Sequence, residues 1–362
     1  MTIFELILTS NYSTIQGGSV MKIGLYANTH GIGYRDDVNN YTRSVPGQLL
    51  KPVEVAQTAE HCGFHSMWFP DHVCMPSETS SAHIANQTGA RSYSPRHEML
   101  DAAVVMGAVA VATSELKLGT SVLVAPYRQP LSDARQFATI DILSGGRLLF
   151  GVGAGWMAEE FEALGIDFAE RGKRTVECIE IYKRSWSQDF VSFDGEYYSF
   201  ANISMDPKPL QEPRPPIIYG GVSPLGARRA ATYCDGFYPV FLDPFADPHR
   251  HSDLQNIIAE ELQAQGRQTS EFIMMAATTM RVTDQSDPLA KETPRKICTG
   301  TPEQVLEDLE KFAEAGYSLV VAKMDCPSGE VQEILEQLGR VGQDIIPESV
   351  GIEASGGWRT DI

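Results

Sequence analysis

The chain has 362 residues, of which 43% are hydrophobic and 21% charged, the composition of an ordinary globular protein. Its formal net charge of −18 argues against nucleic acid and against an anionic membrane surface as partners. No run of about 18 apolar residues occurs, so the sequence predicts no membrane span. The six cysteines stand singly with no CxxC pair, which is typical of reduced thiols in a cytoplasmic protein.

The first segment, residues 1–20, lacks the basic start and the small-residue cleavage site of a secretory signal peptide. We expect it to be an N-terminal extension. A single domain is expected over 21–348, followed by a C-terminal tail at 349–362.

From Met21 onward, short apolar runs of β-type residues alternate with segments of helical periodicity. Strands are expected at 22–27, 65–70, 116–126, 147–153, 215–221, 236–240, 272–282 and 317–324. Helices are expected at 51–63, 100–113, 130–146, 170–186, 224–233, 252–265, 301–316 and 328–347. The run 190–200 breaks the alternation, because β-type residues flank Asp194-Gly195, a strong hairpin signal.

Alternating strands and helices imply an α/β protein with a parallel sheet, and about eight such units favour a closed (β/α)8 TIM barrel. A doubly wound open sheet is the alternative, which the glycine run "GVGAGW" at 151–156 would suit. That fold carries its glycines in the first strand–helix unit, whereas here they follow the fourth strand. We expect inserted loops after strand 1 (28–50), after strand 2 (73–99) and in the 240–270 region. In a barrel, the first two lie on the C-terminal face, where active sites form.

Polar residues close the second and third expected strands. Asp71 and His72 follow the second strand, where a carboxylate and an imidazole could bind a polar ligand or move a proton. A surface turn explains the pair equally well. In the third strand, Gly119, Thr120 and Ser121 indicate either a bulge close to a ligand or ordinary core packing.

A glycine-rich turn follows the fourth expected strand. Gly153, Ala154 and Gly155 are expected to lead into a helix, and the unpaired backbone N–H groups at a helix start bind anions. A tight strand-to-helix turn without a ligand is the other interpretation.

A second such turn follows the fifth strand, where Gly220 and Gly221 precede Ser223 as a helix cap and Pro224 as the first helical residue. Two glycine turns on one face of a barrel favour an extended phosphorylated cofactor more than either turn alone. No HExxH or Cys/His ligand spacing predicts a metal site, and no GxSxG elbow occurs.

Several segments together resemble a known family: "KIGLYA", "AEHCGFHSMWFPDH", "LKLGTSVLVAP", "SGGRLLFGVGAGW" followed by "EFEALG", and "PPIIYGG" followed by "GARRAA". They are similar to the bacterial luciferase-like superfamily of flavin-dependent monooxygenases and oxidoreductases, over residues 21 to about 345. The chain looks closest to the branch that depends on coenzyme F420, a deazaflavin. The resemblance implies a TIM barrel with inserted segments, usually a homodimer.

The resemblance also implies roles for individual residues. Such proteins commonly carry a non-proline cis peptide in the third strand, here Ser121–Val122, on which the flavin-type ring rests. His72 matches a position near the reactive face of that ring, and Asp71 would orient the imidazole or the ring edge. Backbone N–H groups that hold the cofactor phosphate map to Ala154, Gly155, Gly220, Gly221 and Val222, with Ser223 at the start of the next helix.

One position departs from the pattern. Relatives that oxidise sugar phosphates with coenzyme F420 carry a glutamate proton donor directly after the fourth-strand glycines, where this chain has Trp156. That departure argues against sugar oxidation. A tryptophan there suits an apolar substrate or packing against the cofactor ring, and packing into the core is an equal alternative.

The cofactor expected from the resemblance is coenzyme F420, whose anionic tail would be met by Arg35, Arg91 or Arg128. FMN, supplied in reduced form by a separate flavin reductase, is the alternative. The corresponding functions are hydride transfer to or from a small organic substrate, and oxygenation through a peroxyflavin. A non-catalytic flavin-binding protein is a third hypothesis.

Overall fold

The computed structural model describes residues 20–29, 45–81, 98–240, 242–326 and 328–362. In this part of the chain, eight parallel strands form a closed barrel, because each pairs with the next and the last pairs with the first. In order around the barrel they are β1 (Lys22–Tyr26), β2 (Ser66–Phe69), β3 (Lys117–Thr120), β5 (Leu148–Gly153), β8 (Ile217–Gly220), β9 (Gly236–Tyr238), β10 (Ile273–Val282) and β12 (Leu319–Met324). The expected TIM barrel is confirmed.

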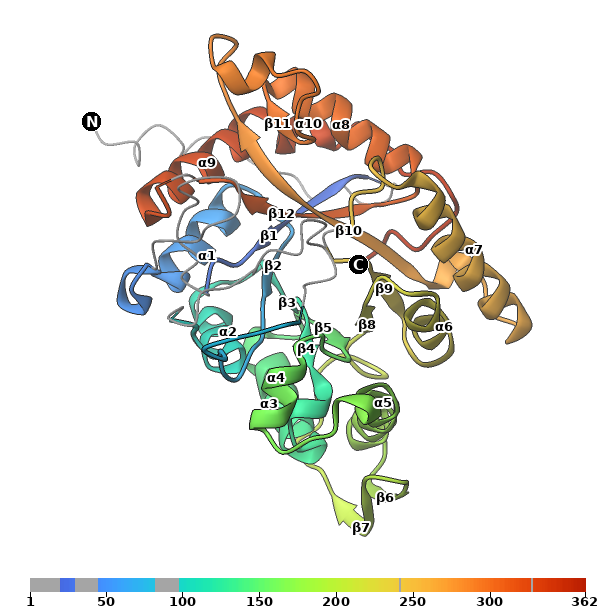
Figure 1. Cartoon of the computed structure of the whole chain (residues 1–362). Coiled ribbons are helices and arrows are strands. Elements are labelled where there is room, and N and C mark those ends of the chain that lie inside the picture. Colours follow the sequence, from blue (N-terminus) through green and yellow to red (C-terminus); the bar gives the residue numbers. More distant parts are fainter. Residues whose placement is uncertain (1–19, 30–44, 82–97, 241, 327) are drawn as a thin grey trace.

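Helices cover the outside of the barrel (Figure 1). They are α1 (Pro52–His61), α2 (Ala102–Ala112), α3 (Pro130–Ser144), α5 (Arg171–Ser187), α6 (Pro224–Tyr233), α7 (Pro248–Ala264), α8 (Pro302–Glu314) and α9 (Val331–Asp344), with the short α4 (Ala158–Ala163) and α10 (Ile346–Ser349). Several begin with proline, whose fixed φ and missing N–H suit the first helical turn. Single turns of 3-10 helix join them at η2 (Gly47–Leu49), η3 (Ala125–Tyr127), η4 (Phe168–Glu170), η5 (Thr269–Glu271) and η6 (Pro288–Lys291).

Four short strands of the described residues stand outside the eightfold pattern. The expected hairpin is present as β6 (Phe190–Asp194) and β7 (Ser199–Ser204), which extend away from the barrel beyond α5 (Figure 1). β4 (Leu123–Val124) pairs with β5, as β3 does before it, and β11 (Thr299–Gly300) pairs with β10.

The 240–270 region is not an inserted loop. Its residues from Pro248 to Ala264 form α7, a regular barrel helix that packs against α6. Leu254, Ile258 and Leu262 recur every four residues and are buried, so they hold one face of α7 against the barrel. Of the loops expected after strands 1 and 2, most of 28–50 and 73–99 lies outside the described residues, as does the N-terminal extension up to residue 19.

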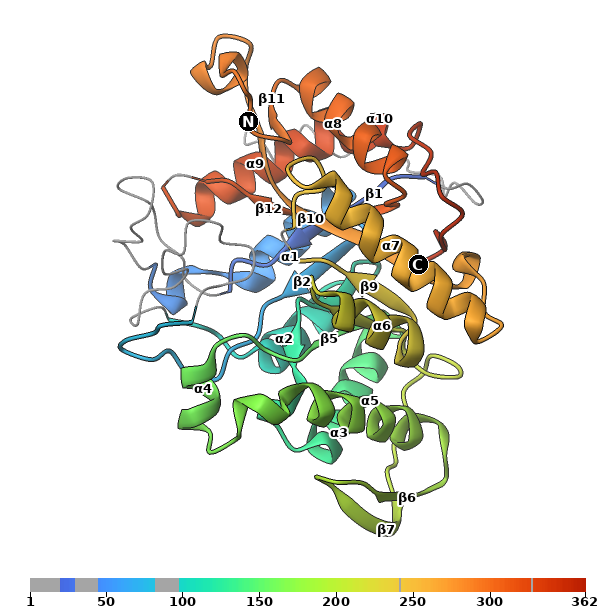
Figure 2. The same ribbon diagram turned by 45° about the vertical axis from the view of Figure 1, so that its right-hand side comes forward.

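The C-terminal segment closes the N-terminal end of the barrel. Lys22 Nζ donates to Thr360 O at 2.5 Å, and His65 Nε2 lies 2.9 Å from Ile362 O. The Arg359 N–H donates to Phe272 O at 3.0 Å. Ile362 is buried and belongs to the apolar cluster inside the barrel. This part of the expected tail is therefore packed into the domain, and it runs beside α7 before it reaches the barrel end (Figure 2).

None of the helices in the described part of the chain is long and apolar enough to cross a membrane. The same residues hold no cluster of three or more His, Cys, Asp or Glu side chains that could bind a metal ion.

Candidate functional site

The sequence-predicted site residues follow the C-terminal ends of neighbouring strands. Phe69 of β2 pairs with Thr120 of β3, and Gly153 of β5 pairs with Gly220 of β8. Asp71–His72, Ser121–Val122 and the two glycine turns come directly after these paired positions. Because the strands are parallel, all four segments meet at one mouth of the barrel.

Val122 occupies the space between β5 and β8. The Ser121–Val122 peptide bond is cis, as the resemblance implied. A Cβ atom on Gly153 would lie 2.7 Å from Val122 Cγ2, and one on Gly220 would lie 2.7 Å from Val122 Cγ1. Real Cβ contacts are never this short. A side chain at either glycine would therefore clash with Val122, which lies between β3 and β4, whatever ligand binds.

The other glycines of "GVGAGW" have the same kind of explanation. A Cβ on Gly151 would lie 1.9 Å from the backbone oxygen of Thr120. Gly155 has φ +80°, and its Cβ would lie 2.7 Å from Val124 and 2.8 Å from Phe161. The absence of side chains at these glycines therefore allows β3, β4 and α4 to pack closely against this segment.

What the turns offer to a ligand is their backbone N–H groups. Those of Ala154 and Gly155 in the first turn, and of Val222 and Ser223 in the second, make no hydrogen bond to any residue that the structure describes. Arg250 Nη2 donates to Val222 O at 2.8 Å, so a guanidinium also stands at the second turn. Unpaired amides and a cation are the groups that hold phosphate oxygens.

Two expectations for these turns need correction. The Gly221 N–H donates to Tyr238 O at 3.1 Å, because the ladder between β8 and β9 continues for one residue, so it is not available to a phosphate. Gly220 lies within β8 and is paired on both sides, with Gly153 and Tyr238. The first turn does not run straight into a helix either, since α4 begins only at Ala158, whose N–H donates to Ser81 Oγ.

The start of α6 is as expected. Ser223 caps the helix, with its Oγ accepting from the Gly226 N–H at 3.1 Å, and Pro224 is the first helical residue. The hydroxyl of Ser223 therefore lies at the same turn as the open N–H groups.

His72 is held by a glutamate that the sequence analysis did not single out. Its Nδ1 lies 2.7 Å from Glu160 Oε2, and the two side chains are 6% and 0% exposed. Glu160 Oε1 accepts from the N–H groups of Val73 at 2.6 Å and Cys74 at 3.1 Å. The Trp156 ring stands edge-on to the imidazole at 6.0 Å between centroids, so it packs beside His72 at the mouth.

The carboxylate oxygens of Asp71 bond to groups other than the imidazole, so of its two expected roles only that of orienting the ring edge of a cofactor stays a prediction. One of its oxygens accepts from Arg128 Nη2, and the other accepts from the Val124 N–H at 3.1 Å. The Asp71 side chain is 1% exposed, so the pair is a buried ion pair. Arg128 therefore pairs with Asp71 within the protein, and its expected contact with a cofactor tail stays a prediction. Arg35 and Arg91 lie outside the described residues.

Sequence comparison identifies the family. Residues 38–295 match the sequence profile of the family described as Luciferase-like monooxygenase. The chain belongs to this family. The resemblance seen in the motifs is thereby confirmed, and it places the luciferase-like barrel among enzymes.

Some relatives of this luciferase-like chain have no known function, and others are named as enzymes. An uncharacterised protein of Mycobacterium tuberculosis is 31% identical over 241 residues, which is 66% of this chain and 77% of that protein. The FMNH(2)-dependent dimethylsulfone monooxygenase of Pseudomonas putida is 36% identical over 141 residues, 38% of this chain and 39% of that enzyme.

Solved structures share the fold at lower identity. The F420-dependent secondary alcohol dehydrogenase, in complex with an F420-acetone adduct, has a TM-score of 0.69 at 21% identity and covers 91% of this chain and 99% of its own. The EDTA monooxygenase of Chelativorans sp. BNC1 has a TM-score of 0.68 at 16% identity, covering 94% and 97%. At these identities the likeness shows the barrel fold.

Glu160 carried a signal that the sequence analysis did not use. It lies in "EFEALG", a segment that helps to mark the luciferase-like family, four residues after Trp156. A glutamate in the first turn of a helix is usually explained by the helix dipole. Only the packing of α4 against the segment after β2 gives it a buried partner.

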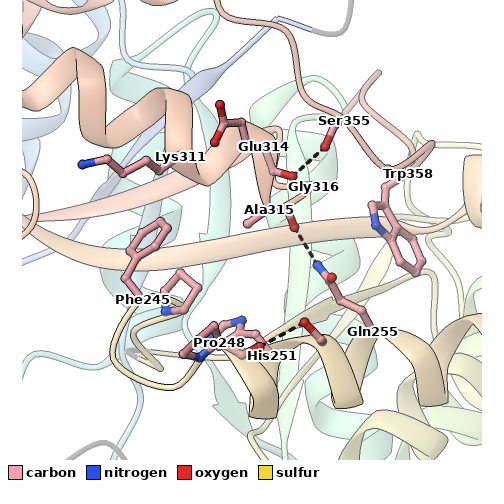
Figure 3. A pocket seen from close by; sticks show the side chains of 13 residues that line it. Phe245, Pro248, His251, Gln255, Lys311, Glu314, Ala315, Gly316, Ser355 and Trp358 are labelled. Atoms are coloured by element: carbon pink, nitrogen blue, oxygen red, sulfur yellow. Dashed lines mark hydrogen bonds between the residues drawn. The ribbon is translucent and has the colours of Figure 1, made fainter.

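A pocket of about 530 Å³ on the outside of the luciferase-like barrel is a different feature (Figure 3). It lies between α7, the end of α8 and the C-terminal segment, with Phe245, Lys311 and Trp358 on its walls. His251 uses both ring nitrogens, on Tyr317 Oη and Leu242 O, and Gln255 donates to Ala315 O. The residues that line this pocket are different from those at the barrel mouth.

Proposed function

We propose that the barrel mouth binds a phosphorylated flavin-type cofactor, with coenzyme F420 favoured, and transfers a hydride between it and a small organic substrate. The observation that carries the proposal is the set of open N–H groups at Ala154, Gly155, Val222 and Ser223, beside a buried imidazole at the same mouth. Membership of the luciferase-like family supports it. The fold shared with an F420-dependent secondary alcohol dehydrogenase agrees with it.

The residues present fit such a cofactor. The two turns and Arg250 would hold its phosphate, and Val122, packed between β5 and β8, would support its ring. When bound, coenzyme F420 supplies a carbon that accepts or donates a hydride. Oxidation of an alcohol to a carbonyl also releases a proton, and His72 would accept that proton on Nε2 because Glu160 accepts a hydrogen bond at Nδ1. In the reverse direction His72 would return it.

A second candidate is oxygenation with reduced FMN, supplied by a separate reductase. The similarity to the FMNH(2)-dependent dimethylsulfone monooxygenase favours it. In that case the same turns would hold the FMN phosphate, and Trp156 beside His72 would form an apolar wall of the substrate site.

Cofactor titration of the purified protein separates these candidates. We would follow absorbance and fluorescence on adding coenzyme F420 and FMN, each oxidised and reduced. The first candidate predicts tight binding of coenzyme F420. Binding of FMN alone would replace the first candidate with the second, and binding of neither would contradict both.

We further propose that the protein is a homodimer formed through α2. The sequence of this helix, AAVVMGAVAVA, is apolar throughout, yet Val104 is 73% and Val111 is 67% exposed. A helix that is apolar on every side is normally buried. With a net charge of −18, two copies would repel each other over most surfaces, and the uncharged face of α2 is suited to a second copy.

Light scattering on a sizing column tests the dimer. Val104→Lys with Val111→Lys is expected to give a monomer with an unchanged circular dichroism spectrum. Val350→Lys changes an exposed apolar residue elsewhere, 43% exposed at the end of α10, and should leave the dimer intact. A monomeric wild type would contradict the proposal.

A further inference from the structure

We propose that Glu160 is a positioning residue that fixes the tautomer of His72, with the proton on Nδ1. The carboxylate and the imidazole are both buried, and Nδ1 lies 2.7 Å from Oε2. The assignment of the tautomer follows from the groups around Glu160 alone. Its consequence for catalysis rests on the proposed function.

The surroundings of Glu160 keep it ionised. Burial alone would raise the pKa of its carboxyl, but the hydrogen bond from His72, the positive charge that His72 carries when protonated, and the hydrogen bonds from Cys74 and Val73 outweigh burial and hold the pKa below its usual value. Oε1 already accepts two backbone N–H groups. An ionised carboxylate has no proton to give, so in the contact at Oε2 the imidazole must be the donor.

A donor at Nδ1 determines the other side of the ring. In a neutral imidazole one nitrogen carries the proton and the other accepts. With Nδ1–H committed to Glu160, a neutral ring has its lone pair on Nε2, which is the form that takes a proton from a substrate. Asp71, the neighbour of His72 in sequence, does not accept the proton of Nδ1, because its two oxygens already accept from Arg128 and from the Val124 N–H.

The neighbour of Glu160 provides a matched control. Glu159 Oε1 accepts from the Ser80 N–H at 2.6 Å, from Ser80 Oγ at 2.9 Å and from the Ser81 N–H at 3.1 Å. It therefore ties α4 to the segment after β2, as Glu160 does, but its contacts are with Ser80 and Ser81, whereas the contact with His72 is made by Glu160. Glu159→Gln and Glu160→Gln would both weaken the contact between α4 and the segment after β2. Only Glu160→Gln should also change the tautomer of His72.

The test uses ¹⁵N-labelled histidine in the full-length protein and long-range ¹H–¹⁵N spectra, which distinguish the two tautomers of a neutral ring. His72→Gln assigns the signals. In the wild type and in Glu159→Gln we expect His72 to carry its proton on Nδ1. In Glu160→Gln, whose amide both donates and accepts, we expect the Nδ1–H form to lose its dominance.

Two outcomes overturn the proposal: a wild-type His72 with its proton on Nε2, or a tautomer unchanged by Glu160→Gln. If Glu160→Gln does not fold, Glu160→Asp keeps the charge and should restore the Nδ1–H form in a folded protein. These spectra need no cofactor, so they stand even if the protein binds neither coenzyme F420 nor FMN. Once a cofactor is assigned, turnover should fall at least tenfold in Glu160→Gln and less in Glu159→Gln.

Discussion

The two ends of the barrel differ in how completely the chain itself supplies hydrogen-bond partners to their polar groups. At the N-terminal end, Lys22 and His65 are bonded to the backbone of residues 359–362. At the C-terminal end, the backbone N–H groups of Ala154 and Gly155 in the first turn, and of Val222 and Ser223 in the second, have no partner in the described part of the chain. Buried polar groups need partners, and one end supplies them from its own chain. Under the proposed function, a bound cofactor would be the partner of these N–H groups at the other end.

The largest effect is expected where the mouth depends on bare backbone. Gly151→Ala would place a methyl group 1.9 Å from Thr120 O, so we expect loss of the folded protein, by more than about 4 kcal/mol. Gly339→Ala in α9 meets nothing within 4 Å and should add up to about 1 kcal/mol. Urea unfolding followed by circular dichroism measures both. A stable Gly151→Ala protein would contradict the packing explanation of the glycine run.

An intermediate effect is expected at the closed end, as a dependence on pH. Burial and the charges of Lys22 and Lys117 lower the pKa of His65 to about 3, from a usual 6.5. Between these values the unfolded chain binds the proton and the folded one does not. The stability that His65 contributes is therefore complete above pH 6.5 and is lost as the pH falls toward 3, by at most about 1.4 kcal/mol per pH unit.

Urea unfolding at several values between pH 6.5 and 4.5 tests this. His65→Gln should flatten the loss of stability relative to the wild type. His61→Gln, which changes an exposed histidine at the end of α1, should leave the slope unchanged. If stability depended on pH equally in all three proteins, burial at the N-terminal end of the barrel would not prevent protonation of His65.

The smallest effect separates capping from ligand binding at the open end. Ser223→Ala removes the cap of α6, and Thr301→Ala removes that of α8, each costing about 1 kcal/mol of stability. Only Ser223→Ala is expected to weaken cofactor binding, by about 3- to 10-fold, because Ser223 lies at the turn that is proposed to hold the cofactor phosphate. Fluorescence titration with the bound cofactor measures this, and equal affinities for both variants would place the phosphate elsewhere.

Much of the barrel could be predicted from local signals. Ser223-Pro224 and Thr301-Pro302 mark helix starts, and Asp194-Gly195 marks the hairpin, because caps and turns depend on a few adjacent residues. The helix expected at 252–265 is confirmed as α7, but the expectation of an inserted loop at 240–270 was wrong because the start of the region, "DPFADPHRHSD", is polar and rich in proline. There the four-residue spacing of the apolar side chains was the better guide.

The site was harder to predict because its contacts join distant segments. The sequence showed that bare backbone was needed after the fourth strand, but not that Val122 and Thr120 of the neighbouring strand required it. It placed Asp71 beside His72, yet the carboxylate that bonds the imidazole is Glu160, 88 positions along the chain. Packing, not proximity in sequence, selects the partner.

The attachment of α4 to the segment after β2 has a consequence for engineering and for divergence within the family. Glu159 and Glu160 bind Ser80, Ser81 and His72, so two adjacent residues hold both the base of a loop and the orientation of the imidazole. The contacts between the two segments therefore depend on residues from both. A chimera that imports residues 72–81 from a relative should import residues 158–163 with them, and substrate range and proton transfer are expected to diverge together.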